Sequence, residues 1–330
     1  MGLVDRFGRV HDDLRISVTD RCNLRCSYCM PVEPVWYPHE HLLHYEEIAQ
    51  LVRLFARQGI RKLRVTGGEP LVRRDLPLLI GMLRGIDGIE DFSLTTNGIL
   101  LGRFAADLAA AGLSRVNVSL DTLDHERFRR ITRRDRLDDV LAGLDAAVRF
   151  GLSPVKVNAV LLRGENEDEL ETLVEHSRER GWELRLIEYM PLENDGSWRP
   201  ERVVRGDELR RRISRRWPIE PDPDGDPHAP ATRWRFTDGR GRIGFIDSIS
   251  DPFCSSCSRL RLTCDGILRA CLYDDVECDL KTPLRNGAGE EELLRRIRDT
   301  VERKGQGGAL QILEQRHVRP QSRTMHQIGG

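Results

Sequence analysis

Residues 14–31, LRISVTDRCNLRCSYCMP, decide the fold of this chain. They begin as an alternating, β-branched strand and run directly into a loop that carries Cys22, Cys26 and Cys29. Short apolar runs then alternate with amphipathic helical segments as far as residue 190, which is typical of successive βα units. The expected strands are LRISVT, KLRVT, FSLTT, RVNVSL, VKVNAVLL and ELRLIEYM.

Six such units predict an α/β fold in which parallel strands form a partial, TIM-like (β/α)6 barrel. Apolar residues at helical spacing predict the intervening helices, at residues 45–57, 76–83, 104–111, 138–150 and 167–180. Functional residues gather at the carboxyl ends of parallel strands, so we expect one shared mouth. The residues at or just after these ends are Cys22, Gly67, Gly68, Thr95, Ser119 and Met190.

The composition changes in the second part of the chain. Residues 220–231, EPDPDGDPHAPA, combine Pro, Gly and acidic residues without apolar periodicity, as in a linker. We therefore expect a barrel core over residues 1–218, which ends in a basic helix, a linker over 219–231 and a smaller C-terminal region over 232–330.

Paired strands are expected in the C-terminal region. TRWRFTD and GRIGFIDSI predict one pair, and RLRLTC-DG-ILRACLY predicts a hairpin with a type I′ turn at Asp265 and Gly266. The hairpin follows Cys254 and Cys257 and contains Cys271, so it positions a second set of three cysteines.

The charge balance argues against two classes of partner. Lys and Arg number 52 and Asp and Glu 53, which favours neither a nucleic-acid polymer nor a membrane surface. The N-terminus has no apolar core of signal-peptide length, and no later stretch approaches a membrane span. We expect a soluble, cytoplasmic protein, in which eight cysteines indicate metal or redox chemistry rather than disulfides.

The first cysteine set suits an iron–sulfur cluster. Thiolates at Cys22, Cys26 and Cys29 can hold three irons of a [4Fe-4S] cluster and leave the fourth iron open for chemistry. Structural zinc is the alternative, but it requires four closed ligands, and the nearby histidines lack the spacing of a zinc finger.

The second set again offers three thiolates without a clear fourth, at Cys254, Cys257 and Cys271. Alternation places Arg259 and Arg261 on one face of the strand that follows. Such a face can simply be solvated. Directly after a cluster loop, however, the two arginines suit a clamp for phosphate.

Two further cysteines, Cys264 and Cys278, lie outside both sets, and we expect them to be bystanders. A cluster that uses Cys264 is the alternative to this ligand assignment.

The first cysteine motif, with Tyr28 before its third cysteine, and TGGEP at residues 66–70 resemble the signature of the radical S-adenosylmethionine (SAM) superfamily. Together with FCSSCSRLRLTCDGILRACL and the terminal IGG, in the same order over residues 13–330, they resemble the GTP 3′,8-cyclase family. That family opens molybdenum-cofactor biosynthesis. The resemblance implies two [4Fe-4S] clusters, one on each cysteine set, and SAM as a further cofactor.

The resemblance also implies a reaction. The reduced first cluster cleaves SAM to methionine and a 5′-deoxyadenosyl radical, which removes the 3′ hydrogen of GTP. The ribose radical attacks guanine C8, and reduction then gives 3′,8-cyclo-7,8-dihydro-GTP. The second cluster binds the guanine. No side chain is expected to be catalytic, because the radical comes from SAM.

Binding residues follow from the same resemblance. Those expected to bind SAM are Tyr28, Gly68, Ser119 and Met190, of which Met190 could equally be core packing. Those expected to bind GTP are Arg15, Arg64, Thr95, Lys156, Arg259, Leu260 and Arg261, with Lys62, Arg185, Gly329 and Gly330 as further candidates. Cations on several strands suit a triphosphate. The two terminal glycines are less specific, because chain ends are by default poorly ordered.

Other readings stay open from the sequence. Another two-cluster radical SAM enzyme, such as a peptide maturase, is the alternative among enzymes. An iron–sulfur electron carrier or a zinc-stabilised scaffold is the alternative among other classes, although neither needs a SAM site or interior cations. The expected product acceptor is cyclic pyranopterin monophosphate synthase. The electron donor and the oligomeric state, including a homodimer, are not fixed by the sequence.

Overall fold

The computed structural model describes residues 2–192, 198–226, 228–273, 276–315 and 323–329. Its centre is a run of six parallel strands that are neighbours in chain order. They are β3 (Asp13–Ser17), β4 (Lys62–Thr66), β5 (Asp91–Thr96), β6 (Arg115–Ser119), β7 (Lys156–Val160) and β8 (Glu183–Ile187). The six predicted strands and the α/β fold are confirmed.

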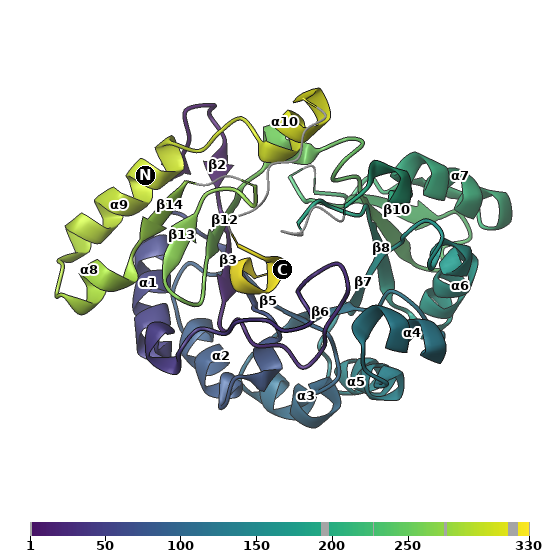
Figure 1. Cartoon of the computed structure of the whole chain (residues 1–330), viewed down its shortest axis with the longest axis horizontal. Coiled ribbons are helices and arrows are strands. Elements are labelled where there is room, and N and C mark those ends of the chain that lie inside the picture. Colours follow the sequence, from purple (N-terminus) through teal and green to yellow (C-terminus); the bar gives the residue numbers. More distant parts are fainter. Residues whose placement is uncertain (1, 193–197, 227, 274–275, 316–322, 330) are drawn as a thin grey trace.

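Helices cover the outer face of the curved sheet (Figure 1). They are α1 (Tyr45–Arg57), α2 (Leu76–Arg84), α3 (Leu101–Ala110), α4 (His125–Thr132), α5 (Leu137–Arg149) and α6 (Leu170–Arg180). The core lies between these helices and the sheet, where Leu14, Ile16 and the apolar face of α1 are almost fully buried. Each such leucine or isoleucine contributes about 1.5–3 kcal/mol by leaving water.

The short helix α4 was not predicted from the sequence. It buries only Phe128, Ile131 and Thr132, so its apolar pattern is too brief to stand out. Its start is fixed instead by Asp124, whose side chain accepts a hydrogen bond from the Arg127 N–H.

The C-terminal region extends both edges of the same sheet. β12 (Arg259–Leu262) pairs with β3, and β11 (Arg242–Ile246) pairs with β8, both in parallel. β13 (Ile267–Arg269) and β14 (Glu277–Asp279) follow on one side, and β10 (Thr232–Phe236) and β9 (Ile219–Pro221) on the other. Within the described residues β14 and β9 are the outer strands, so the barrel is partial rather than closed. The boundary at residues 219–231 remains a prediction.

Two local expectations were wrong. The start of the expected linker is strand β9, whose Pro221 lies on the sheet edge, where its missing N–H removes no ladder bond. The β12–β13 turn is not of type I′, because that type needs positive φ at both central residues. Here Gly266 has φ +85° but Asp265 does not have positive φ. The Gly266 N–H instead bonds to the Thr263 carbonyl oxygen at 3.0 Å, and Cys264 and Asp265 are the central residues.

The remaining helices, strands and turns complete the chain. They are β1 (Leu3–Val4), β2 (Val10–His11), α7 (Gly206–Arg216), α8 (Lys281–Arg285), α9 (Glu290–Glu302), α10 (Gly308–Gln315), α11 (Met325–Ile328) and the short 3-10 turns η1 (His39–His41), η2 (Pro70–Val72), η3 (Glu167–Glu169), η4 (Pro200–Arg202) and η5 (Phe253–Ser256). α7 is the basic helix expected before the linker. In the described residues no helix is both long and apolar enough to cross a membrane.

Candidate functional site

A first cavity opens at the carboxyl ends of the parallel strands. The structure brings together there all three cysteines of the first set and every residue expected to bind SAM: Cys22, Cys26, Cys29, Tyr28, Gly68, Ser119 and Met190. They come from the loop after β3 and from the ends of three other strands, β4, β6 and β8. This convergence follows from the parallel topology, which places all strand ends on one rim.

The two glycines after β4 pack against the backbone that leads into the cysteine loop. The Gly68 N–H donates to the Thr19 carbonyl oxygen at 2.7 Å. A Cβ at Gly68 would lie 2.4 Å from the Asp20 carbonyl oxygen, and one at Gly67 would lie 2.6 Å from that of Thr19. Glycine is therefore required here by contact between two backbone segments, and the cysteine loop rests directly on them.

Glu69 completes this support from inside the core. It is fully buried, and its carboxylate accepts hydrogen bonds from the Leu71 N–H at 3.0 Å, the Thr96 hydroxyl at 2.7 Å and the Asn97 N–H at 2.6 Å. Burial raises the pKa of Glu69 to about 7 although these bonds act in the opposite direction. The carboxylate joins the turn after β4 to the end of β5.

Asn97 is a residue that our sequence reasoning missed. Its amide nitrogen lies 2.7 Å from Asn23 Oδ1 and 3.7 Å from Cys22 Sγ, so it holds the start of the cysteine loop. Its position directly after the end of β5 was the available signal. Burial, followed by the charge of Glu69, raises the pKa of Cys22 to about 11.

Asp121 is a second missed residue, two positions beyond Ser119. It accepts a hydrogen bond from the Tyr28 hydroxyl through Oδ2 and one from the Val160 N–H, at 2.9 Å, through Oδ1. Burial raises the pKa of Asp121 to about 6. The pair fixes the side chain of Tyr28, which lies between Cys26 and Cys29 in the sequence.

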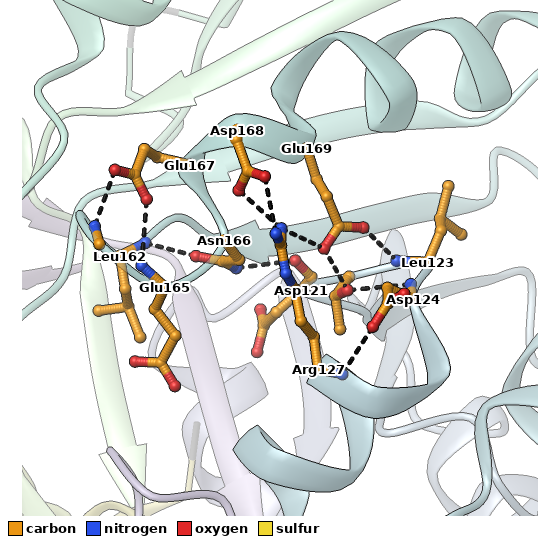
Figure 2. A network of polar contacts seen from close by, with 12 residues as sticks. Asp121, Leu123, Asp124, Arg127, Leu162, Glu165, Asn166, Glu167, Asp168 and Glu169 are labelled. Carbon is orange, nitrogen blue, oxygen red and sulfur yellow. Dashed lines mark hydrogen bonds and ion pairs between the residues drawn. The ribbon is translucent and has the colours of Figure 1, made fainter.

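The loops around Asp121 are locked by the polar network of Figure 2. Asn166 donates to the Asp121 carbonyl oxygen at 2.8 Å and accepts from the Leu162 N–H at 2.7 Å. Nearby, Arg127 forms a bidentate pair with Asp168 and also contacts Glu169. The loop after β6 is thereby tied to the loop after β7, which keeps the rim of the first cavity in place.

A second cavity adjoins the first. It is lined by Cys254, Cys257 and Cys271, together with the predicted GTP residues Arg15, Arg64, Thr95, Arg259 and Arg261. The two cavities share the lining residues Thr95, Asn158, Ile187, Met190 and Met325. A molecule in the second cavity would therefore lie directly next to one in the first.

The charged side chains that line the second cavity are all arginines. Arg15 Nε, Arg64 Nε and Thr95 Oγ1 are buried and have no hydrogen-bond partner in the described structure. Burial, followed by the charge of Arg64, lowers the pKa of Arg15. Burial likewise lowers the pKa of Arg261, to about 9, with Arg259 as the next cause. Such a wall calls for an anionic ligand.

A third cavity, toward the amino ends of the strands, shares Arg64 and Arg185 with the second. Its lining also contains Lys62 and Lys156 and the acidic residues Asp13, Asp91 and Asp226. Burial, followed by the charge of Arg185, lowers the pKa of Lys156 to about 7. Lys62 and Arg185 differ from the others because they already pair with carboxylates, Asp12 at 3.2 Å and Glu183 at 2.7 Å.

The side chain of Leu260 points away from the second cavity, unlike those of its two neighbours in β12. Its side chain is fully buried in the hydrophobic core, whereas Arg259 and Arg261 face the second cavity. The predicted alternation of β12 is confirmed by this, and it leaves only the backbone of Leu260 as a candidate for ligand contact.

The C-terminal tail enters the site. Figure 1 shows the end of the chain near the middle of the barrel opening. The Gly329 carbonyl oxygen accepts a hydrogen bond from Arg261, and a Cβ at Gly329 would lie 2.9 Å from that of Ser17. Gly330 lies outside the described residues.

Each cysteine set presents three thiol groups to one cavity, which is the donor set of a four-iron cluster with one open iron. All eight cysteines are free thiols. Among the described residues no three His, Cys, Asp or Glu side chains converge tightly enough to hold one metal ion. A four-iron cluster has no such requirement, because each thiolate binds a different iron. Neither Cys264 nor Cys278 lines the first or the second cavity in the described structure, and their role as bystanders remains a prediction.

The chain matches two family models. Residues 16–176 match the radical SAM superfamily, and residues 182–310 match Molybdenum Cofactor Synthesis C. A GTP 3′,8-cyclase of Rhodopirellula baltica is 47% identical over 335 residues, which cover 100% of this chain and 92% of that protein. A GTP 3′,8-cyclase of Moorella thermoacetica is 50% identical over 290 residues, with 88% and 90% covered.

A solved structure shares the fold. SuiB of Streptococcus suis bound to S-adenosylmethionine superposes with a TM-score of 0.57 at 15% sequence identity. The match covers 81% of this chain, which spans only 62% of that one. At this identity the likeness concerns the fold alone, whereas the identity to the curated relatives over the whole chain decides the family. The chain belongs to the GTP 3′,8-cyclase family of the radical SAM superfamily.

Proposed function

We propose that this chain is a radical SAM lyase that converts GTP to 3′,8-cyclo-7,8-dihydro-GTP in molybdenum-cofactor biosynthesis. The observation that carries the proposal is the junction of the two cavities. Each cavity holds one cysteine set, they share five lining residues, and buried cations lie on the side away from the first set. A radical formed in the first cavity would meet a nucleotide in the second without crossing solvent.

The first cysteine set would hold the cluster that cleaves SAM, and the second set would hold the cluster that binds guanine. Cys22, Cys26 and Cys29 would each bind one iron, which leaves the fourth iron for the methionine amino and carboxylate groups. Tyr28, Gly68, Ser119 and Met190 would surround the SAM molecule. Asn97 and Asp121 would keep the loop and its tyrosine in position.

The interior cations would bind the triphosphate. Arg15 and Arg64 present buried N–H groups without protein partners, which phosphate oxygens can satisfy. Lys156 and Arg185 would extend the contact along the third cavity, with Lys62 at its rim. Because the phosphates are held at a fixed distance from the second cysteine set, the ribose would be presented to the first cavity.

Anaerobic reconstitution tests the proposal. The protein is loaded with iron and sulfide, reduced with SAM and GTP, and analysed by chromatography. We expect about eight irons per chain, together with 5′-deoxyadenosine and a cyclised guanosine triphosphate. Formation of 5′-deoxyadenosine with unchanged GTP would point to another radical SAM substrate, such as a peptide. Absence of bound iron would contradict the proposal altogether.

Binding of GTP is expected to weaken as the pH rises. Lys156, whose pKa is about 7 in the free protein, must be protonated to pair with phosphate. Above pH 7 binding has to take up a proton, so the affinity falls by up to about tenfold between pH 6 and pH 8. Equilibrium dialysis of GTP measures this slope. In Lys156→Met, the pH dependence of the affinity comes from the nucleotide and the other residues alone. An equal pH dependence in both proteins would contradict the assignment of Lys156 to the phosphates.

We further propose that the product passes to cyclic pyranopterin monophosphate synthase and that the chain acts in the cytoplasm. The family match to Molybdenum Cofactor Synthesis C supports the place in this pathway.

A further inference from the structure

A buried lysine lies beside the second cysteine set and has no part in the proposed binding of GTP. Lys304 follows α9 and is 1% exposed. Its ammonium nitrogen lies 3.0 Å from the Arg259 carbonyl oxygen, 3.4 Å from the Cys257 carbonyl oxygen and 3.6 Å from Cys257 Sγ. A fourth contact, of 3.5 Å, joins it to His11 Nδ1. All four partners can accept, and an ammonium offers three donors, so the surroundings suit the charged form.

His11 and Asp5 hold this lysine from the other side. Because Lys304 donates to Nδ1, the imidazole carries its own proton on Nε2, which donates to Asp5 Oδ2 at 3.1 Å. Asp5 also accepts from Arg9 Nε at 2.6 Å. The carboxylate is thus engaged by His11 and Arg9. Among the ion pairs of the described residues none joins Lys304 to a carboxylate.

Arg9 fixes the same cysteine loop at its other end. Its guanidinium donates to the carbonyl oxygens of Cys254 at 2.8 Å, Gln306 at 2.7 Å and Gly305 at 2.7 Å. The N-terminal hairpin and the segment after α9 therefore hold the backbone of both cysteines in the C-x-x-C motif. Lys304 differs from Arg9 in one respect, since it also reaches a cysteine sulfur.

The charges around the two cysteine sets are opposite in sign. Buried Glu69 stands beside the first set, where it accepts from the Asn97 N–H at 2.6 Å, and the Asn97 side-chain amide lies 3.7 Å from Cys22 Sγ. At the second set the buried ammonium of Lys304 lies 3.6 Å from Cys257 Sγ, and Arg259 lines the same cavity as this cysteine. A buried positive charge this close to a sulfur favours negative charge on it.

An iron–sulfur cluster gains negative charge when it is reduced, so cations and N–H···S hydrogen bonds raise its reduction potential. We propose that Lys304 is a positioning residue that holds Cys257 and makes the second cluster easier to reduce than the first. The inference rests on the proposed function, because it needs a cluster on the second cysteine set. Reduction adds one electron from an external reductant, and no bond or proton changes at Lys304.

The test is a dithionite titration of the reconstituted protein, followed by electron paramagnetic resonance of each cluster. In Lys304→Met we expect the reduction equilibrium of the second cluster to become about tenfold less favourable, which equals about 59 mV for one electron. The first cluster should be unchanged, and Lys304→Arg should behave as wild type. Lys281→Met is the matched control, because the ammonium group of the partly exposed Lys281 donates to the His41 carbonyl oxygen at 2.8 Å and Lys281 lines neither of the two cysteine cavities in the described structure.

Each alternative result has a distinct meaning. An equal potential in wild type and Lys304→Met would overturn the inference. If Lys304→Met loses iron, the reduction of the second cluster is measured in Lys304→Gln instead, because glutamine keeps a hydrogen-bond donor but carries no charge. If both neutral variants lost the second cluster while circular dichroism showed a folded chain, Lys304 would be needed only to hold the cysteine loop. That result would also overturn the electrostatic role. Wild-type protein with only about four irons would remove the proposed second site itself, and the inference with it.

Discussion

Cys22→Ala is expected to abolish 5′-deoxyadenosine formation, whereas Cys271→Ala should retain it and lose cyclisation of GTP. The reason is geometric, because the two cysteines line different cavities that only adjoin. Three thiolates in one loop hold the first cluster, so the loss of one leaves too few ligands. The measurement is chromatography of both products after anaerobic turnover, with iron content determined for each variant.

The matched control for this pair is Cys278→Ala. Cys278 lies on β14, only partly buried, and lines neither cavity in the described structure. We expect this variant to form both products at wild-type rates. Equal loss of SAM cleavage in the Cys22 and Cys271 variants would contradict the division of work between the two cysteine sets. Loss of either product in Cys278→Ala would reopen the ligand assignment.

Gly68→Ala is expected to prevent the first cysteine set from binding its cluster, although no cysteine is changed. The new Cβ would lie 2.4 Å from the Asp20 carbonyl oxygen and 2.5 Å from that of Arg21, both backbone atoms that cannot rotate away. The loop that leads into Cys22 must therefore move. We expect about 1–3 kcal/mol lower free energy of unfolding, a loss of about four irons per chain and no 5′-deoxyadenosine.

The control for the glycine is Gly81→Ala in α2. A Cβ at Gly81 would meet nothing within 4 Å apart from the backbone of its own helix, so alanine should be neutral or raise the free energy of unfolding by up to about 1 kcal/mol. Urea denaturation and iron analysis of both variants distinguish the two positions. Full iron content and normal SAM cleavage in Gly68→Ala would show that the loop does not rest on this glycine as the contacts indicate.

Much of the site could be predicted because it follows the strand ends. The order of strands and the position of Gly68, Thr95, Ser119 and Met190 are local properties, set by alternating apolar residues and the turns after them. Parallel topology then brings these ends together without further information. The errors were equally local. The type of the turn at Asp265 was predicted wrongly because it depends on backbone angles that residue types do not fix. The helix α4 was not predicted because its apolar face is short.

Other contacts could not be read from the chain because they join residues far apart in it. Asp121 accepts from Tyr28 across 93 positions, and Lys304 reaches Cys257 across 47 and His11 across 293. Nothing in the sequence around Lys304 distinguishes it from a solvated lysine at the end of a helix.

The sequence by itself determined the cysteine sets, the six βα units and the family. Each of these depends on spacing along the chain, which residue types record directly. Only the tertiary structure decided that the two cavities adjoin, that Leu260 is core while its neighbours face the cavity, and that opposite charges flank the two cysteine sets. The physical reason is that the burial of a side chain and the charges around it depend on several segments of the chain, and only folding brings these segments into contact.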